Sequence, residues 1–123
     1  MNILVVEDQQ VVRELLTAVA TSALAGARVT AVGDLESALE AARAMPVDLV
    51  LLDLGLPGCR GIDALKRFKE AYPSVVIVIV SSNDDSRVIS DALAAGASGY
   101  LTKGVSPSGL ASALAGLRRP AGS

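Results

Sequence analysis

Three acidic side chains in the first half of the chain each follow a short apolar run. Glu7 and Asp8 come after the run at residues 3–6, and Asp53 comes after the run at residues 49–52. Apolar runs without alternation are typical of parallel strands that are covered by helices on both faces. The carboxyl ends of such strands meet at one edge of a sheet, which would bring the three carboxylates together. Because these carboxylates repel each other, the sequence predicts a hard divalent cation with oxygen ligands, and Mg²⁺ is the first candidate.

Two further polar side chains follow later apolar segments in the same way. Ser81 ends the run at residues 75–80, and Lys103 follows the segment at residues 98–102. A lysine and a hydroxyl that face an acidic cluster supply a cation and a hydrogen-bond donor for an anion. A phosphoryl group is the anion that magnesium most often accompanies. The pattern therefore predicts phosphoryl transfer to Asp53.

Each of these residues also has a purely structural interpretation. Asp53 could cap the strand end or the following turn, for which Pro57 and Gly58 are typical turn residues. The acidic pair after the first run could solvate a strand end, Ser81 could act as a cap, and Lys103 could lie on the surface. The joint placement of these residues at the ends of four expected strands favours the chemical interpretation.

The composition fits one small domain with an aliphatic core. The chain has 123 residues, 51% of them hydrophobic, and its only aromatic residues are two tyrosines and one phenylalanine. This length suits a single domain. So few aromatic rings do not provide a base-stacking surface. The net charge of −2 gives no electrostatic reason to expect direct binding to nucleic acid or to an anionic membrane.

The cysteine and histidine content is typical of a reducing compartment. The single cysteine, Cys59, excludes a disulfide scaffold, and the absence of histidine excludes His-based metal sites. The amino terminus has no cationic region and turns acidic after an apolar run, unlike a signal peptide. The longest apolar run, at residues 75–80, is too short to span a bilayer. We therefore expect a cytoplasmic protein.

Five expected strands alternate with five segments of helical periodicity. We expect strands at residues 3–6, 28–32, 49–52, 75–80 and 98–102. Apolar residues recur at helical spacing in the segments at residues 11–19, 35–42, 62–72, 88–95 and 110–117. This strict alternation predicts an α/β fold, a doubly wound parallel sheet with right-handed crossovers. The strand at residues 28–32 has a more polar face and is expected at the sheet edge.

Polar residues, glycines and prolines mark the expected helix ends. The first helix is expected to end near Ala25 and Gly26, and Asp34 is the expected N-cap of the second. Residues 83–85 should open the fourth helix, and Gly96 should follow its last turn. Ser106 is the expected N-cap of the fifth helix, with proline at the first helical position.

Over residues 2–117 the chain resembles the receiver domain of response regulators in two-component signalling, the CheY-like superfamily. The matching motifs are VVED at residues 5–8, LLDLGLPG at residues 51–58, IVSS at residues 79–82 and GYLTK at residues 99–103. The resemblance implies a flavodoxin-like fold with five parallel strands in the order 2-1-3-4-5. It also implies a receiver domain over residues 1–119, followed by a tail at residues 120–123.

The resemblance implies a role for each residue around the acidic cluster. Asp53 would accept the phosphoryl group. Asp8 and Asp53 would bind Mg²⁺ directly, Glu7 would bind it through water, and Gly55 would bind it through its backbone carbonyl. Such a domain catalyses its own phosphorylation and dephosphorylation without being a conventional turnover enzyme.

The resemblance also implies how the signal enters and leaves. Ser81 and Lys103 would contact the phosphoryl oxygens, and Tyr100 would be an aromatic switch that follows Ser81 inward. The donor would be a histidine of a sensor histidine kinase or phosphotransfer protein, since this chain has no histidine. The fourth helix, fifth strand and fifth helix would form the docking surface for a partner or for a second copy in a homodimer.

The output of the protein stays open at this stage. The segment GASGYLTKGVSPSGL at residues 96–110 resembles receivers that are fused to a helix-turn-helix DNA-binding domain. The chain is therefore either a stand-alone receiver or the front part of a transcriptional regulator. The receiver itself is expected to bind neither nucleic acid nor a membrane.

Three positions depart from the family pattern. Arg60 stands where the family usually has Asn or Asp, so the loop would be looser or Arg60 would reach toward the phosphate. Gly104 stands where many receivers have proline, and we expect a trans bond after Lys103 because a cis bond to a non-proline residue is costly. Ser82 replaces a small apolar residue. None of these changes removes a residue needed for phosphorylation.

Two other function classes fit parts of the sequence. A pseudo-receiver, which is a phosphorylation-independent interaction module, is disfavoured because every acidic, hydroxyl and lysine residue of the site is present. An aspartyl-phosphate hydrolase needs a second acid two residues after its nucleophile, and this chain has Gly55 there. The glycines at Gly55, Gly58 and Gly61 are not followed by Lys-Ser or Lys-Thr, so they do not make a nucleotide-binding loop.

Overall fold

The structure is a computed structural model that describes residues 1–56, 62–104 and 106–116. Strands and helices alternate strictly along these residues. The strands are β1 (Asn2–Val6), β2 (Arg28–Val32), β3 (Leu49–Leu52), β4 (Val76–Ser81) and β5 (Gly99–Thr102). The helices are α1 (Gln10–Ala23), α2 (Leu35–Ala44), α3 (Asp63–Ala71), α4 (Ser86–Ala94) and α5 (Pro107–Gly116).

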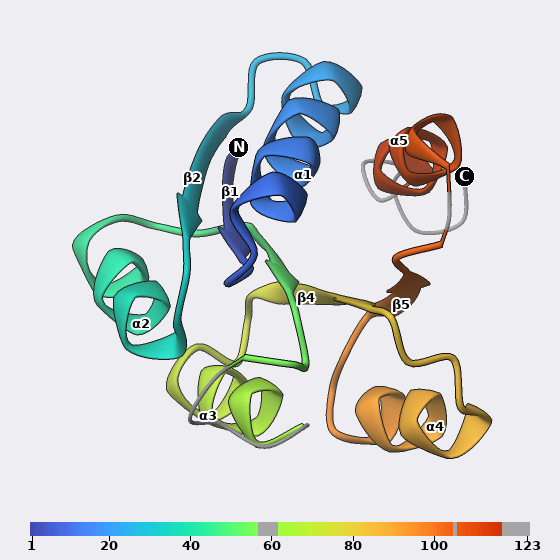
Figure 1. Cartoon of the computed structure of the whole chain (residues 1–123). Helices are drawn as coiled ribbons and strands as arrows, with labels where there is room; N and C mark the ends of the chain where they lie inside the picture. The colour runs from blue at the N-terminus through green and yellow to red at the C-terminus, as the bar shows by residue number, and fades with distance from the viewer. Residues whose placement is uncertain (57–61, 105, 117–123) are drawn as a thin grey trace.

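The strands form one parallel sheet in the order β2-β1-β3-β4-β5, which confirms the predicted fold class and strand order (Figure 1). The register aligns Val6 of β1 with Leu52 of β3, and Leu52 with Ile79 of β4. The carboxyl ends of β1 and β3 therefore lie level, and β4 continues past them to Ser81. The chain first moves outward from β1 to β2 and then crosses back to β3, so the strand order reverses between β1 and β3. Ligands of open α/β sheets bind outside the strand ends at such a reversal.

Helices cover both faces of the sheet, and the pleat divides the core between them. Ile3 and Val5 of β1 face a buried cluster to which α1 and α5 contribute. Leu4 and Val6 face the opposite cluster, to which α2, α3 and α4 contribute (Figure 1). All four side chains are fully buried, so β1 cannot slip by one residue without exchanging its two apolar faces. This fixed register holds the residue after β1 at one position on the sheet edge.

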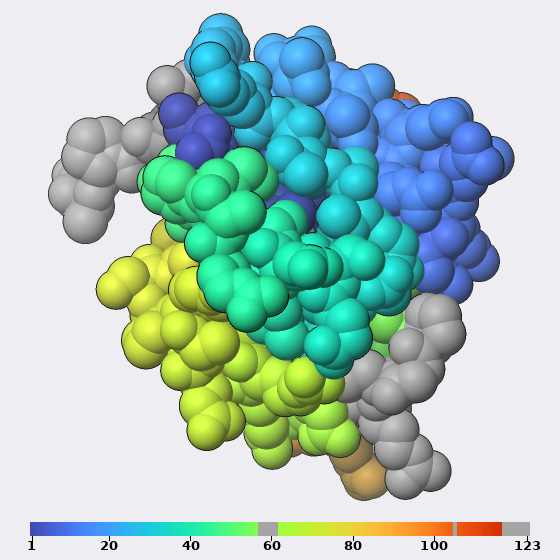
Figure 2. Space-filling view, turned by 90° about the vertical axis from the view of Figure 1, so that its left-hand side faces the viewer, coloured from blue at the N-terminus to red at the C-terminus, as the bar shows by residue number. Residues whose placement is uncertain are grey.

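The ends of the sheet differ in exposure. β2 is an edge strand with a half-exposed burial pattern, as its polar face indicated. Figure 2 shows the side of the molecule formed by β2 and α2, with α1 beside them. Within the described ranges, no helix is both long enough and apolar enough to cross a membrane.

Side-chain caps begin three of the helices where the sequence indicated. The carboxylate of Asp34 accepts a hydrogen bond from the Ser37 amide at 2.7 Å at the start of α2. Asp85, within the expected opening at residues 83–85, caps α4 by accepting from the Arg87 amide at 2.8 Å. Ser106 Oγ accepts from the amide of Gly109 at 3.1 Å in the first turn of α5. Such caps satisfy amides that have no partner inside the helix.

Two boundaries differ from the sequence expectations. Helix α1 ends at Ala23, before the expected Ala25–Gly26, because Leu24 leaves helical geometry and its side chain is fully buried. Strand β4 begins at Val76 and includes Ser81, so the hydroxyl belongs to the strand. Gly96 has a φ of +111°, which explains why glycine follows α4.

Several sequence expectations lie outside the described residues. They concern the Pro57–Gly58 turn, Cys59, Arg60, Gly61, the last residue of the fifth helix segment at 117, and the boundary between residue 119 and the tail at 120–123. The bond between Lys103 and Gly104 is trans, as are the other peptide bonds of the part of the chain that is described.

Phe68 offers a test of the core on the α3 face. Its ring is fully buried and lies 5.5 Å from the Tyr72 ring between centroids. We expect Phe68→Ala to lower the free energy of unfolding by about 3–5 kcal/mol, because the cavity adds to the lost burial. Leu93→Ala on α4, where the side chain is 46% exposed, should change it by less than about 0.5 kcal/mol. Urea unfolding of both variants measures the difference, and equal losses would contradict this account of the core.

Candidate functional site

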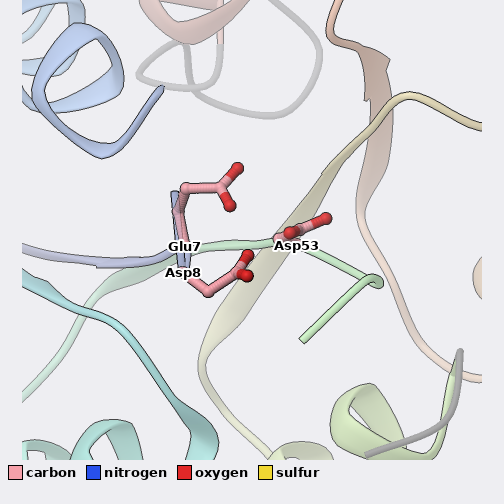
Figure 3. A group of neighbouring side chains, drawn as sticks. All are labelled: Glu7, Asp8 and Asp53. Carbon is pink, nitrogen blue, oxygen red and sulfur yellow. The ribbon is translucent and has the colours of Figure 1, made fainter. Parts of the chain in front are cut away.

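The three acidic residues meet at the carboxyl edge of the sheet. The amide of Glu7 donates to the carbonyl of Val32 at 3.0 Å, and the amide of Asp53 donates to the carbonyl of Val6 at 3.0 Å. The backbone pairing therefore continues one residue beyond the strands and fixes where both side chains begin. Glu7, Asp8 and Asp53 each offer one carboxylate oxygen, and these oxygens all lie within 4.8 Å of one another. Figure 3 shows the three side chains gathered at the ends of β1 and β3.

Two of the three acids are buried. Glu7 has no exposed surface and Asp53 is 5% exposed, whereas Asp8 is exposed. Backbone amides support both buried acids. Gly55 donates to Asp53 Oδ1 at 3.0 Å, and Gln9 donates to Glu7 Oε2 at 3.2 Å. Buried carboxylates are rare unless they are paired, so a cation is required nearby.

Lys103, just beyond β5, supplies that cation. Its Nζ lies 2.6 Å from Glu7 Oε1 and 3.4 Å from Asp53 Oδ2. No hydrogen bond from the rest of the described chain reaches this buried Oε1. The cluster thus sets three carboxyl groups against one ammonium and is short of positive charge, which a divalent cation would supply.

Burial sets the titration of the pair. Burial raises the pKa of Glu7 above its ordinary value of 4.5. The contact with Lys103 and the hydrogen bond from Gln9 lower this pKa, but they offset the effect of burial only in part. The nearby Asp53 raises the pKa further. Burial alone would lower the pKa of Lys103. The contact with Glu7 and the charge of Asp53 outweigh burial and raise it above 10.5. Each charge in the pair therefore depends on the other.

The donor set fits a hard divalent metal ion. Such ions take oxygen ligands, and the smaller ones bind through one or two carboxylates while keeping several waters. Here two carboxylates are buried, one is exposed, and the buried Oε1 of Glu7 is paired with the lysine ammonium. The exposed side of Asp8 leaves room for water ligands. The three residues therefore form a candidate site for one metal ion.

Ser81 lies at the same edge, one strand away. It is the last residue of β4, is 5% exposed, and aligns with Thr102 of β5. Its carbonyl accepts from the amide of Lys103 at 2.8 Å, and its Oγ accepts from the amide of Asn83 at 3.1 Å. Because the hydroxyl accepts from Asn83, its own proton stays available to a ligand. The sheet thus brings Ser81 and the acidic cluster to one edge.

Tyr100 connects β5 to the loop that follows Ser81. The ring is half-buried against the core of the α2, α3 and α4 face. Its hydroxyl donates to the carbonyl of Asn83 at 2.5 Å. The Asn83 side chain also accepts from the amide of Asp85, the N-cap of α4, at 2.9 Å. Asn83 therefore has hydrogen bonds with Ser81, with Tyr100 and with the N-cap of α4.

Two residues of this site did not stand out in the sequence. Asn83 was expected only at a helix opening. Arg13 on α1 donates from Nη1 to the carbonyl of Glu7 at 2.8 Å and lies 3.5 Å from the carbonyl of Asp8. Its position five residues after Asp8 was the available signal, but an arginine on an amphipathic helix usually indicates a solvated face.

A groove at the opposite end of the sheet contains none of these residues. It has a volume of about 500 Å³ and is lined by residues 42–47 and 71–75, which precede β3 and β4. Figure 2 shows these two segments next to each other. Since ligands of such sheets bind at the carboxyl ends of the strands, the groove does not compete with the acidic cluster as the candidate site.

Comparisons with known proteins agree with the geometry. The family model for the response regulator receiver domain matches residues 3–115. The glycerol metabolism activator of Pseudomonas putida is 36% identical over 103 residues, which cover 83% of this chain and 47% of that protein. The response regulator UvrY of Escherichia coli is 30% identical over 114 residues, covering 92% of this chain and 52% of that protein. The chain thus spans about half the length of these curated relatives.

Solved structures show the same fold. A two-component response regulator of the LuxR family from Aurantimonas sp. has a TM-score of 0.84 at 32% identity, covering 94% of this chain and 83% of that one. The activated receiver domain of DrrB has a TM-score of 0.82 at 24% identity, covering 96% of this chain and 97% of that one. The second match supports the fold alone.

The pairing of Glu7 with Lys103 predicts a pH-dependent loss of stability in Lys103→Met. Without the ammonium, the pKa of buried Glu7 rises further. A carboxyl whose folded pKa is raised stabilises the fold below its unfolded pKa, and this contribution is lost as the pH rises from 4.5 through the folded pKa. Near neutral pH the variant should lose about 1–3 kcal/mol relative to wild type, less than for a fully enclosed pair because Lys103 is 20% exposed.

Urea unfolding in magnesium-free buffer checks this expectation at about pH 5 and about pH 8. The difference in free energy of unfolding between wild type and Lys103→Met should be larger at about pH 8 than at about pH 5. The double variant Glu7→Gln/Lys103→Met should recover most of the loss, because it removes the unpaired buried charge. A loss that is the same at both pH values would contradict the assigned pairing.

Proposed function

Because the chain belongs to the response regulator receiver family, we propose that it is the phosphoacceptor of a two-component system and that Asp53 takes the phosphoryl group. The donor is a histidine of a sensor kinase or phosphotransfer protein. The observation that carries the proposal is the enclosure of Asp53 by Glu7, Asp8 and Lys103 at the point where the strand order reverses. The proposal is supported by the close approach of the Asp53 carboxylate, the two other carboxylates and the Lys103 ammonium.

Asp8 and Asp53 hold Mg²⁺ directly in this proposal, with Glu7 acting through water and Gly55 through its carbonyl. Magnesium supplies charge neutralisation for the acceptor carboxylate and the phosphoryl oxygens. The support is the cluster of carboxylate oxygens within 4.8 Å of one another. The Gly55 amide already donates to Asp53 Oδ1, which keeps the loop after β3 close to the metal ligands.

The chain's own side chains position the transfer. A carboxylate oxygen of Asp53 attacks the phosphorus, the new O–P bond forms as the N–P bond to the donor histidine breaks, and the electron pair of that bond returns to the imidazole. Lys103 Nζ is 3.4 Å from Asp53 Oδ2. At this distance the ammonium can pair with the carboxylate before the transfer and with a phosphoryl oxygen after it. The hydroxyl of Ser81 donates a hydrogen bond to a second phosphoryl oxygen. Positioning and charge neutralisation provide most of the catalysis in phosphoryl transfer.

The output passes through α4, β5 and α5 in this proposal. Phosphorylation draws the Ser81 hydroxyl toward the phosphate, Tyr100 follows inward, and the changed surface docks a partner or a second copy of the chain. The hydrogen bonds of Asn83 with Ser81, Tyr100 and Asp85 support this route. A local event of this kind biases an element with two arrangements.

The domain organisation belongs to the same proposal. We assign the receiver to residues 1–119 and a short tail to residues 120–123, in a cytoplasmic protein. The relatives named above are about twice as long as the matched segment, and one solved neighbour is a LuxR-family regulator. We therefore favour the front part of a DNA-binding transcriptional regulator over a stand-alone receiver. The receiver itself contacts neither nucleic acid nor membrane.

Phosphorylation by a small acyl-phosphate donor tests the acceptor directly. With magnesium, the wild-type chain should be labelled at Asp53 alone, as mapped by reductive trapping and mass spectrometry. Asp53→Asn should abolish the label, and Asp8→Asn or chelation of the metal should lower it by about 10-fold or more. Asp63→Asn, a change of the same kind in an exposed acid at the start of α3, should leave it unchanged. Label on another acid, or full labelling of Asp53→Asn, would overturn the proposal.

A matched pair of tyrosine variants tests the output route. Tyr100→Phe removes the hydroxyl that donates to Asn83, whereas Tyr72→Phe removes one that lies 3.5 Å from the Leu39 carbonyl, away from the Ser81 loop. A phosphate mimic should shift the amide resonances of residues 84–116 in wild type and in Tyr72→Phe. The shifts should be clearly smaller in Tyr100→Phe, while labelling of Asp53 stays close to wild type. Equal shifts in both variants would remove Tyr100 from the route.

A further inference from the structure

Arg13 is a charged residue that lies beside the site and has no role in the proposed phosphorylation chemistry. It lies on the second turn of α1 and is half-buried. Its Nη1 donates to the carbonyl of Glu7 at 2.8 Å and lies 3.5 Å from the carbonyl of Asp8. Both carbonyls belong to the loop between β1 and α1, which carries two of the three acids. One guanidinium therefore holds the backbone from which two candidate metal ligands project.

The loop has little else to fix the direction of Asp8. The Glu7 amide is bound to β2 through Val32, and the Glu7 carboxylate is bound by Gln9 and Lys103. The Asp8 carboxylate is exposed, and across residues 1–56, 62–104 and 106–116 no hydrogen bond to it is found. Gln9 provides no side-chain cap to α1. The aim of Asp8 toward Asp53 thus depends on its backbone, which Arg13 contacts.

Gly33, in the connection between β2 and α2, gives the guanidinium its space. A Cβ at Gly33 would lie 3.1 Å from Arg13 Nη1 and 4.0 Å from the Glu7 carbonyl oxygen. The φ of Gly33 is outside the left-handed region, so its backbone suits any residue and the constraint is steric. A side chain there would displace the end of the arginine and leave the backbone of Gly33 unstrained.

We propose that Arg13 is a positioning residue for the metal site, and that it holds the carbonyls of Glu7 and Asp8 so that the Asp8 carboxylate points at Asp53. The inference rests on the proposed function in that the ion at this site is Mg²⁺. Arginine suits the task because the two N–H groups of one terminal nitrogen, Nη1, reach both carbonyls and the guanidinium stays charged. Partners that orient metal ligands typically change metal affinity by about 10–100-fold when they are removed.

The positive charge of Arg13 would have the opposite effect on magnesium affinity. A fixed cation near the cluster repels Mg²⁺, so an arginine acting through charge alone would weaken metal binding. Its removal would then tighten binding. An arginine acting through position strengthens binding, and its removal weakens it. The direction of the change in magnesium affinity therefore separates the two roles without any measurement of phosphorylation.

Magnesium titration of the whole chain, followed by the amide resonances of residues 7–9 and 53–55, measures this affinity. We expect Arg13→Met to weaken Mg²⁺ binding by about 10-fold and Arg13→Lys to lie between it and wild type, since an ammonium can replace one of the two contacts. Arg28→Met removes the same charge from an exposed residue at the opposite end of the sheet and should leave the affinity unchanged. All variants are titrated well below their unfolding transitions.

Gly33→Ala tests the contact between the Arg13 guanidinium and the Glu7 carbonyl without changing Arg13 itself. The added methyl should displace the guanidinium and weaken Mg²⁺ binding in the wild-type background. In the Arg13→Met background it should have no further effect, which a double-mutant cycle measures as coupling. Gly116→Ala, where an added Cβ meets nothing within 4 Å, serves as the control and should bind as wild type does.

The outcomes separate this inference from the proposed function. Unchanged or tighter binding in Arg13→Met, or additive effects of Arg13→Met and Gly33→Ala, would overturn the positioning role while labelling of Asp53 still stood. Absence of saturable magnesium shifts at residues 7–9 and 53–55 in wild type would overturn both the metal assignment and this inference. Weaker binding in Arg13→Met, coupled to Gly33→Ala and partly restored by lysine, supports it.

Discussion

The concentration of negative charge at one edge of a parallel sheet is the constraint on which the rest of the structure depends. Three carboxylates each have an oxygen within 4.8 Å of the others, and two of the three side chains are buried. The ammonium of Lys103 lies 2.6 Å from Glu7 Oε1 and 3.4 Å from Asp53 Oδ2. In the sheet order, β3 and β4 separate β5 from β1, so the long lysine side chain spans the width of the site. The cluster still lacks positive charge, which suits a divalent metal ion.

The sheet makes this constraint possible because it leaves the backbone no freedom at the strand ends. Hydrogen bonds from Glu7 to Val32 and from Asp53 to Val6 extend the ladder beyond the last paired residues. The alternation of buried side chains on β1 locks the register from both faces. The backbone positions of Glu7 and Asp53 are thus set by the sheet and by the core packed on both of its faces.

Much of this arrangement could be predicted from the sequence, because it follows from local patterns. Apolar runs identified the strands, polar residues such as Asp34 and Ser106 identified the helix starts, and acids directly after strands identified the site. The position of Lys103 at the acidic cluster was predicted, but its closer contact with Glu7 than with Asp53 was not, since β1 and β5 are not neighbours in the sheet. Arg13 was missed for a related reason: hydrogen bonds from a side chain to backbone carbonyls leave no periodic pattern.

The strand order also determines when the site can assemble. β1 lies between β2 and β3, so Asn2 pairs with Arg28 and Ile3 pairs with Leu49, and every pairing in the sheet joins segments that are far apart in the chain. Folds dominated by such distant pairings form slowly, and domains are built during synthesis from the amino end. The acids, at residues 7, 8 and 53, emerge before Lys103 does. An intermediate that has joined β1 to β3 before β5 docks therefore carries the acidic cluster without its internal cation.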